Sequence, residues 1–189
     1  MNKKRITFVF NAPVVLTFVI ICFGALLLNG FTGGMTNKLY FMTYHSSLQN
    51  LLTYVRFFTH VFGHSGWNHF MGNMVYILLL GPMLEEKYGS GAMIEVIAAT
   101  ALATGLINYF FFPGVALLGA SGVCFAFIIL SSLTGFKRGE IPVTFILVAV
   151  LFIGQQILDG LFVTDNISNM AHIVGGVIGA IFGFVVNRR

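Results

Sequence analysis

One serine and one histidine in apolar surroundings are the residues of this chain that most suggest chemistry. Ser121 stands in the run Gly119-Ala-Ser-Gly122, and His172 stands in the run 171–176, Ala-His-Ile-Val-Gly-Gly. Each begins an apolar segment. Polar side chains in membrane helices usually face the interior of a bundle and mark function, because hydrocarbon offers them no water. A serine nucleophile needs an adjacent base. The pair therefore predicts a nucleophile and its base inside a membrane.

The composition indicates a membrane protein with almost no soluble part. Hydrophobic residues make up 57% of the 189 residues and charged residues only 8%, whereas soluble domains carry roughly 25% charged residues. The net charge of +4 comes from basic residues that are scattered singly or in short clusters. This distribution does not favour nucleic-acid binding. The chain length predicts one domain, residues 1–189.

Six segments are apolar enough to cross a bilayer, for which about 20 residues are needed. They are residues 13–28, 67–84, 92–112, 119–135, 142–161 and 170–186. Pro13 and Pro142 suit the first turn of a helix, where a missing N–H has no cost. We therefore expect an all-α membrane protein, a bundle of six transmembrane helices.

The basic residues predict the orientation of this bundle. If the N-terminus is cytoplasmic, Lys38 and Arg56 lie outside and the other basic residues lie inside: Lys3, Lys4, Arg5, Lys87, Lys137, Arg138, Arg188 and Arg189. An excess of Lys and Arg on the cytoplasmic side is the usual bias. Both termini are thus predicted to be cytoplasmic, in a membrane that we expect to be a bacterial cytoplasmic membrane. The long outer connection, 29–66, is rich in aromatic residues and is expected to lie in the headgroup layer.

This topology brings four polar residues to one depth, just below the outer face. The second, fourth and sixth segments all run inward, and they carry Ser121, His172, His69 and Asn73. His69 and Asn73 are four residues apart and share one helix face. Their side chains and the Ser121 backbone N–H are candidate donors to an oxyanion. Taken singly, Ser121 could bond to its own helix backbone, and His69 with Asn73 could form an ordinary interhelical hydrogen bond.

Small residues predict how the helices approach one another. Gly175, Gly179 and Gly183 form a stripe along the last segment, and Gly122 and Ala126 form a matching stripe on the fourth. Small residues allow close helix packing, which would carry His172 towards Ser121.

No acidic residue is expected at the depth of Ser121 and His172, so we predict a Ser–His dyad without a carboxylate. Phe125, four residues after Ser121, is expected to pack under the imidazole and to take over part of the orienting role of an aspartate. Gln155 and Gln156 point about 100° apart on their helix. We expect them beside the route of a substrate, outside the catalytic set, or in interhelical hydrogen bonds. Cys22 and Cys124 are expected to serve packing.

These residues together resemble the rhomboid family of intramembrane serine proteases, of bacterial type with six transmembrane helices. The resemblance rests on the runs 119–122 and 171–175, on the spacing His64-x4-His69-x3-Asn73, on Arg56 with the residues after it, and on Glu85-x3-Gly89-Ser90. It covers all six segments. Two positions depart from the family pattern: Val55 replaces the usual aromatic residue before Arg56, and Phe125 stands where the family often has tyrosine.

The resemblance implies Ser121 as nucleophile, His172 as base, and His69 and Asn73 as oxyanion residues, supported by Gly119, Gly122, Phe125 and Gly175. It also implies cleavage of transmembrane proteins near their outer ends, at small residues and without a cofactor or metal. Two alternatives stay open. One is an inactive rhomboid-like scaffold that binds membrane proteins. The other is a metal site or transporter built on His60, His64 and His69. The sequence does not indicate an oligomeric state.

Overall fold

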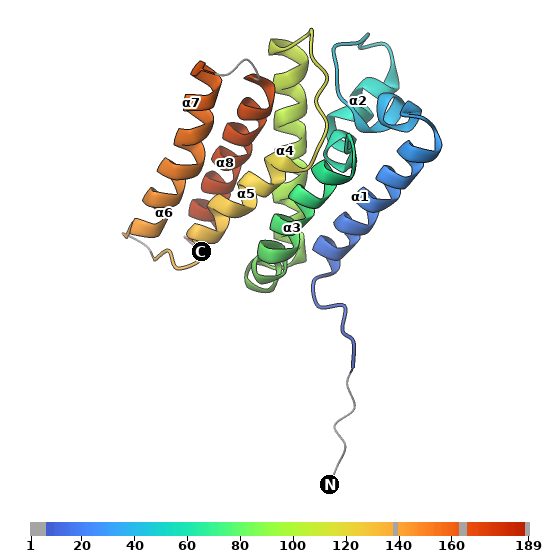
Figure 1. Cartoon of the computed structure of the whole chain (residues 1–189). Coiled ribbons are helices and arrows are strands. Elements are labelled where there is room, and N and C mark those ends of the chain that lie inside the picture. Colours follow the sequence, from blue (N-terminus) through green and yellow to red (C-terminus); the bar gives the residue numbers. More distant parts are fainter. Residues whose placement is uncertain (1–6, 138–139, 163–165, 188–189) are drawn as a thin grey trace.

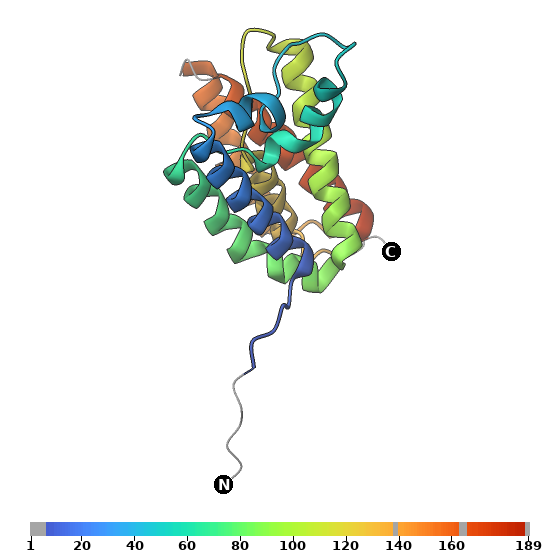
Figure 2. The same cartoon turned by 90° about the vertical axis from the view of Figure 1, so that its right-hand side faces the viewer.

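A computed structural model describes residues 7–137, 140–162 and 166–187, together with the side chains of these residues except at 160–168. The regular secondary structure of the described part is helical, apart from one isolated bridge between Thr43 and Leu117. The long helices are α1 (Pro13–Phe31), α3 (Trp67–Tyr88), α4 (Ser90–Phe111) and α8 (Asn166–Val186). A shorter helix, α5 (Ser121–Ser132), lies among α3, α4 and α8 (Figures 1 and 2). The predicted all-α fold is confirmed.

Each predicted segment contains helix, although the bounds differ. The segment 142–161 is built from α6 (Val143–Val148), a five-residue π-helix η3 (Ala149–Ile153) and α7 (Gly154–Phe162). Three helical stretches are long and apolar enough to cross a membrane, Pro13–Phe31, Ser90–Phe111 and Asn169–Val186. The helices Ser121–Ser132 and Val143–Asp159 are apolar but shorter. Six crossings therefore stay a prediction.

Hydrogen bonds bring together the start of α1 and the ends of α3 and α8. Six crossings in alternating directions would place these three ends on one side of a membrane. At one end, the Glu85 carboxylate of α3 accepts from the backbone N–H groups of Val14 and Val15 in α1, at 2.9 and 3.0 Å. Near the same end, the Asn187 side chain donates to the Tyr88 hydroxyl at 3.1 Å. The start of α1 and the ends of α3 and α8 thus lie together.

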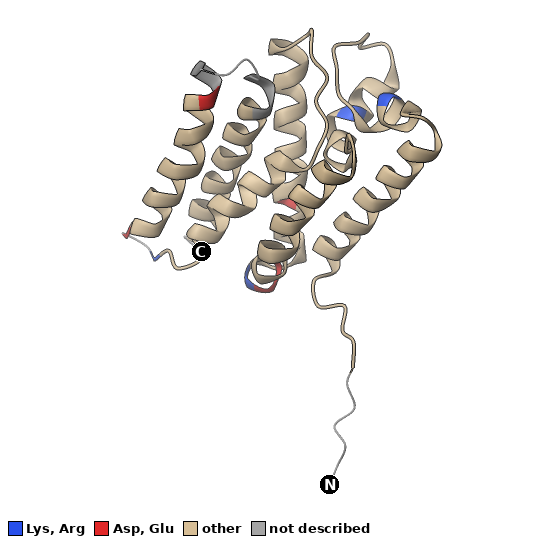
Figure 3. Ribbon diagram, in the orientation of Figure 1, with Lys and Arg blue, Asp and Glu red and all other residues tan. Residues whose placement is uncertain are grey.

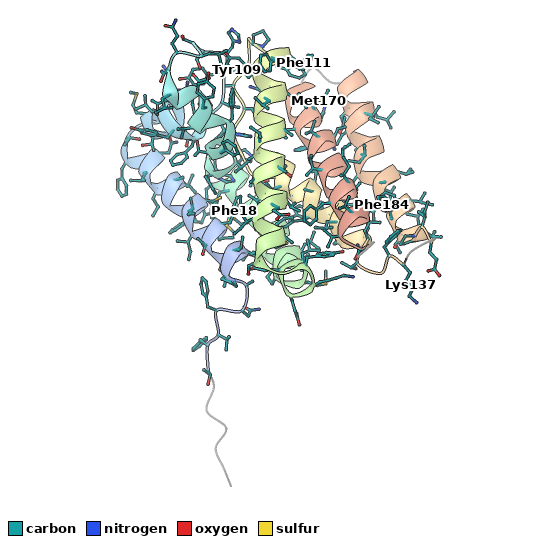
Figure 4. The ribbon with its side chains drawn as sticks, turned by 180° about the vertical axis from the view of Figure 1, so that it is seen from behind. Phe18, Tyr109, Phe111, Lys137, Met170 and Phe184 are labelled. Atoms are coloured by element: carbon teal, nitrogen blue, oxygen red, sulfur yellow. The ribbon has the colours of Figure 1, made fainter. Side chains whose placement is uncertain are left out.

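The described basic residues lie near both ends of the bundle. Lys87 and Lys137 are at the end with the α3–α4 turn, and Lys38 and Arg56 are at the opposite end (Figures 3 and 4). Two described basic residues at each end do not distinguish the predicted orientation from its reverse, so the orientation stays a prediction. The other basic residues of that prediction lie outside the described residues: Lys3, Lys4, Arg5, Arg138, Arg188 and Arg189.

The connection 29–66 is ordered by its own contacts. It contains η1 (Asn37–Phe41), α2 (Leu51–Thr59) and η2 (His60–Phe62). Arg56 is buried, with its guanidinium 4.4 Å from the centre of the Tyr44 ring and hydrogen-bonded to the Tyr44 and Ser46 hydroxyls. Val55 is exposed. Tyr44, rather than a residue at position 55, therefore supplies the aromatic partner of this arginine.

The chain enters α5 as an extended segment and not as helix. The prediction of helix over 119–135 was wrong at both ends, because α5 has only 12 residues. At 1.5 Å per residue it is about 18 Å long, against a hydrocarbon layer of about 30 Å. The segment before it pairs with the outer connection through Thr43 and Leu117, and the Gly119 N–H donates to the His60 carbonyl. These bonds satisfy a non-helical backbone below the rim of the bundle.

Candidate active site

A cavity of about 430 Å³ is lined by polar side chains from four helical segments. Ser121 of α5, His172 of α8, Asn73 of α3 and Gln156 of α7 all line it, beside the Phe125 ring. Three of the four predicted polar site residues therefore face one space. His69 is not part of its lining.

Ser121 is the first residue of α5, and its side chain is half-buried. The N–H groups of a first helical turn have no acceptor within the helix, and the positive end of the helix dipole lies there. No hydrogen bond joins the Ser121 hydroxyl to the His172 ring among the described residues. Such bonds are often long in unliganded active sites and tighten with substrate.

The His172 ring is held from two directions. It stacks on Phe125 with a centroid separation of 4.2 Å and an angle of 4° between the rings, so the predicted packing of Phe125 is confirmed. Its Nδ1 lies 2.6 Å from Oε1 of Gln156. This contact is an interhelical hydrogen bond, which was one of the two alternatives predicted for Gln156, and it places the amide beside the proposed base. Gln155 also lines the cavity, and its amide donates to Asp159 at 2.7 Å.

Asn73 is held by two residues that the sequence analysis did not assign to the site. Its Nδ2 donates to His64 Nε2 at 3.1 Å, and the Cys124 thiol donates to its backbone carbonyl at 3.4 Å. His64 in turn donates from Nδ1 to the Phe62 carbonyl. A primary amide has two N–H donors, so the second N–H of Asn73 can serve a group in the cavity. The spacing between His64 and His69 was the only signal for His64.

His69 lies against the loop that leads to Ser121 rather than in the cavity. A Cβ on Gly119 would come within 2.7 Å of Cε1 and Nε2 of the His69 ring. Gly119 has φ +123°, a conformation that favours glycine. His69 Nδ1 is 3.1 Å from the Ser65 hydroxyl. Gly119 therefore allows both the turn into α5 and the approach of the His69 ring.

Backbone contact between α5 and α8 brings Ser121 and His172 to the same cavity. A Cβ on Gly175 would lie 2.7 Å from the Gly122 carbonyl carbon, and one on Gly179 would lie 2.9 Å from that of Ala126. The predicted glycine stripe is thus confirmed at these two positions. Gly183 contacts the Leu133 side chain instead.

The two other histidines of the alternative metal site are engaged in hydrogen bonds. His60 Nδ1 donates to the Arg56 carbonyl and its Nε2 lies 3.1 Å from the Thr104 hydroxyl. Burial lowers the pKa of His60 and of His64 to about 4, so both rings are neutral at pH 7. Among the described residues, no three His, Cys, Asp or Glu side chains are arranged to hold a metal ion.

Comparison with known proteins points to one family. A sequence model of the Rhomboid domain matches residues 52–189. The chain belongs to the rhomboid family. With its apolar helices, this membership makes it an integral membrane protein.

Relatives of this rhomboid chain come from animals, bacteria and plants. It is 31% identical over 140 residues to Rhomboid-related protein 1 of Caenorhabditis elegans, covering 69% of this chain and 39% of that protein. It is 30% identical over 132 residues to Rhomboid protease GlpG of Salmonella choleraesuis, covering 69% and 48%. Rhomboid-like protein 11, chloroplastic, of Arabidopsis thaliana is 20% identical over 153 residues, covering 74% and 55%. The chain thus spans about half of its relatives or less.

Proposed function

We propose that this protein is an intramembrane serine protease that works through a Ser121–His172 dyad. The observation that carries the proposal is the shared cavity, in which Ser121, His172 and Asn73 meet from α5, α8 and α3. Similarity to a rhomboid protease supports it. No cofactor or metal is part of the proposed chemistry.

The reaction follows from the roles that these groups can take. The Ser121 hydroxyl attacks the carbonyl carbon of a peptide bond, and its proton passes to Nε2 of His172. The oxyanion that forms accepts hydrogen bonds from the free N–H of Asn73 and from the Ser121 backbone N–H. Both donors are fixed before the reaction, Asn73 by His64 and the backbone N–H by α5, and such preorganised donors stabilise developing charge. His172 then protonates the leaving amine, and water hydrolyses the acyl-enzyme.

The proposed substrates are transmembrane segments of other membrane proteins, cleaved near the outer face. The cavity opens among apolar residues of α5 and of the segment 143–162, among them Ile128 and Leu151. Such walls suit a substrate that arrives from the bilayer, unwound at the scissile bond. His69, which contacts Gly119 beside the nucleophile, supports the loop into α5 and is the second candidate for contact with the oxyanion.

Cleavage of a transmembrane reporter in liposomes tests the function. Wild type should cleave it, whereas Ser121→Ala and His172→Ala should each lower cleavage by at least about 1,000-fold, because a dyad acts as a unit. Both variants should keep the wild-type melting temperature within a few degrees. A reporter that binds wild type but is never cleaved would instead identify an inactive scaffold.

A further inference from the structure

We propose that Gln156 is a positioning residue that sets the proton on His172, and so replaces the carboxylate of a catalytic triad. The inference rests on the proposed dyad function. The single contact that carries it is the 2.6 Å separation of His172 Nδ1 and Gln156 Oε1. Gln156 acts through His172 and is not itself required to touch substrate.

The chemistry of the two atoms decides which nitrogen carries the proton. An amide oxygen only accepts hydrogen bonds, so Nδ1 of His172 must be the protonated nitrogen. The neutral ring then has its lone pair on Nε2. That is the nitrogen which must take the Ser121 proton, as in a serine protease where an aspartate on Nδ1 fixes the same tautomer. In papain-like cysteine proteases, the side-chain amide of an asparagine orients the catalytic histidine in the same way.

The register between the helices holds Gln156 at this position. Ile153 lies three residues before Gln156, and residues at this spacing share a helix face. The Ile153 side chain packs directly where a Cβ on Gly176 would stand, and Gly176 is four residues after His172. Two successive turns of the segment 143–162 therefore contact two successive turns of α8.

The π-helix η3 determines which of the two glutamines faces the ring. A π-turn takes one more residue per turn than an α-turn, and it rotates everything that follows. The π-helix ends at Ile153, immediately before α7. Phe152 within it contacts the Phe125 ring edge-on, with centroids 6.1 Å apart. After this turn Gln156 is directed at His172, while Gln155 is exposed and bonded to Asp159.

Two variants at position 156 and a control at 155 test the inference. Gln156→Leu removes the acceptor, and the reaction of Ser121 with a fluorophosphonate should slow about tenfold, the effect of one hydrogen bond. Reporter cleavage should slow by the same factor. Gln156→Glu keeps an acceptor and should label faster than Gln156→Leu. Gln155→Leu should label faster than Gln156→Leu, because Gln155 lines the cavity with its amide bonded to Asp159. Gln156→Leu should add nothing in a His172→Ala background.

The tautomer can be measured without any activity. In protein labelled with ¹⁵N-histidine, the His172 signals are identified by their loss in His172→Ala. We expect a protonated Nδ1 in wild type and in Gln155→Leu, and a mixture of tautomers in Gln156→Leu. A proton on Nε2 in wild type, or wild-type labelling by Gln156→Leu, would overturn the inference. A Gln156-dependent tautomer in a protein that neither labels nor cleaves would uphold it and overturn the proposed protease function.

Discussion

Gly175 of α8 meets Gly122 of α5 backbone to backbone, so closely that a Cβ on Gly175 would stand 2.7 Å from the Gly122 carbonyl carbon. Both glycines are near the proposed dyad: Gly122 follows Ser121, and Gly175 is three residues after His172. The spacing between the two helices thus decides whether the proposed base can reach the proposed nucleophile.

Gly175→Ala should therefore lower stability and activity together. Overpacking of this kind costs about 1–3 kcal/mol, and it should reduce the melting temperature in detergent and the rate of reporter cleavage. Gly24→Ala is the matched control, because a Cβ at Gly24 meets nothing within 4 Å. Gly33 is a poor control although its surroundings are open, because its φ of +59° strains any other residue. Equal melting temperatures for Gly175→Ala and Gly24→Ala would contradict the packing argument.

A fluorophosphonate should modify Ser121 and leave the other serines of the helical region unmodified. Ser131 and Ser132 donate to the backbone of their own helix at 2.7 and 2.6 Å. Ser65 is the alternative nucleophile to be excluded, since its hydroxyl lies 3.1 Å from His69 Nδ1. Mass spectrometry of the labelled protein gives the site. An adduct on Ser65 that survives Ser121→Ala would move the nucleophile to the Ser65–His69 pair.

Loss of the Asn73 amide should slow the chemical step. Removal of one oxyanion donor costs about 10²–10³ in kcat, so Asn73→Ala should cut the maximal rate of reporter cleavage by about that factor. Asn68→Ala, on the exposed side of the same helix, is the control and should cleave normally. If Asn73→Ala raised only KM, the amide would serve substrate binding and not the transition state.

Acid should destabilise the protein through its buried histidines. The pKa of His60 and of His64 is lowered by burial to about 4, against about 6.5 in the unfolded chain. Between these values the unfolded state binds more protons, so the free energy of unfolding falls as the pH falls from about 6.5 towards 4. Melting temperatures between pH 7.5 and 4.5 measure this. His60→Gln should flatten the dependence, and an unchanged dependence in this variant would contradict the role of His60.

Glu85 should contribute to stability through the first turn of α1. Its two carboxylate oxygens accept from Val14 and Val15, and Ser90 donates to it at 2.7 Å. Glu85→Ala leaves these buried and half-buried donors without their acceptor, which costs about 1–3 kcal/mol. The neighbouring Glu86 is exposed, so Glu86→Ala should melt as wild type does. Equal losses of melting temperature in Glu85→Ala and Glu86→Ala would contradict this role of Glu85.

Short-range regularities in the sequence were sufficient to predict much of this protein. Helical segments follow from the length of apolar runs, and the shared face of His69 and Asn73 follows from their spacing. The stripe of Gly175 and Gly179 predicted the close approach of α8 to α5, because packing of small residues depends on period alone. Phe125 was predicted under the His172 ring because it lies four residues after Ser121.

Other features depend on contacts between distant segments and were decided only by the tertiary structure. The π-helix η3 rotates α7, and no periodic pattern in the sequence predicts it. This rotation directs Gln156, and not Gln155, to His172. The extended entry to α5 requires acceptors and donors from residues near Thr43 and His60, far away in sequence. The bond between His64 and Asn73 is short-range, but it depends on the non-helical turn that separates His64 from α3. The sequence by itself determined where the six apolar segments lie and that they contain helix, because these features depend on neighbours within a few turns. The tertiary structure decided which polar atoms meet, because one residue of helical rotation moves a side chain by about 100°.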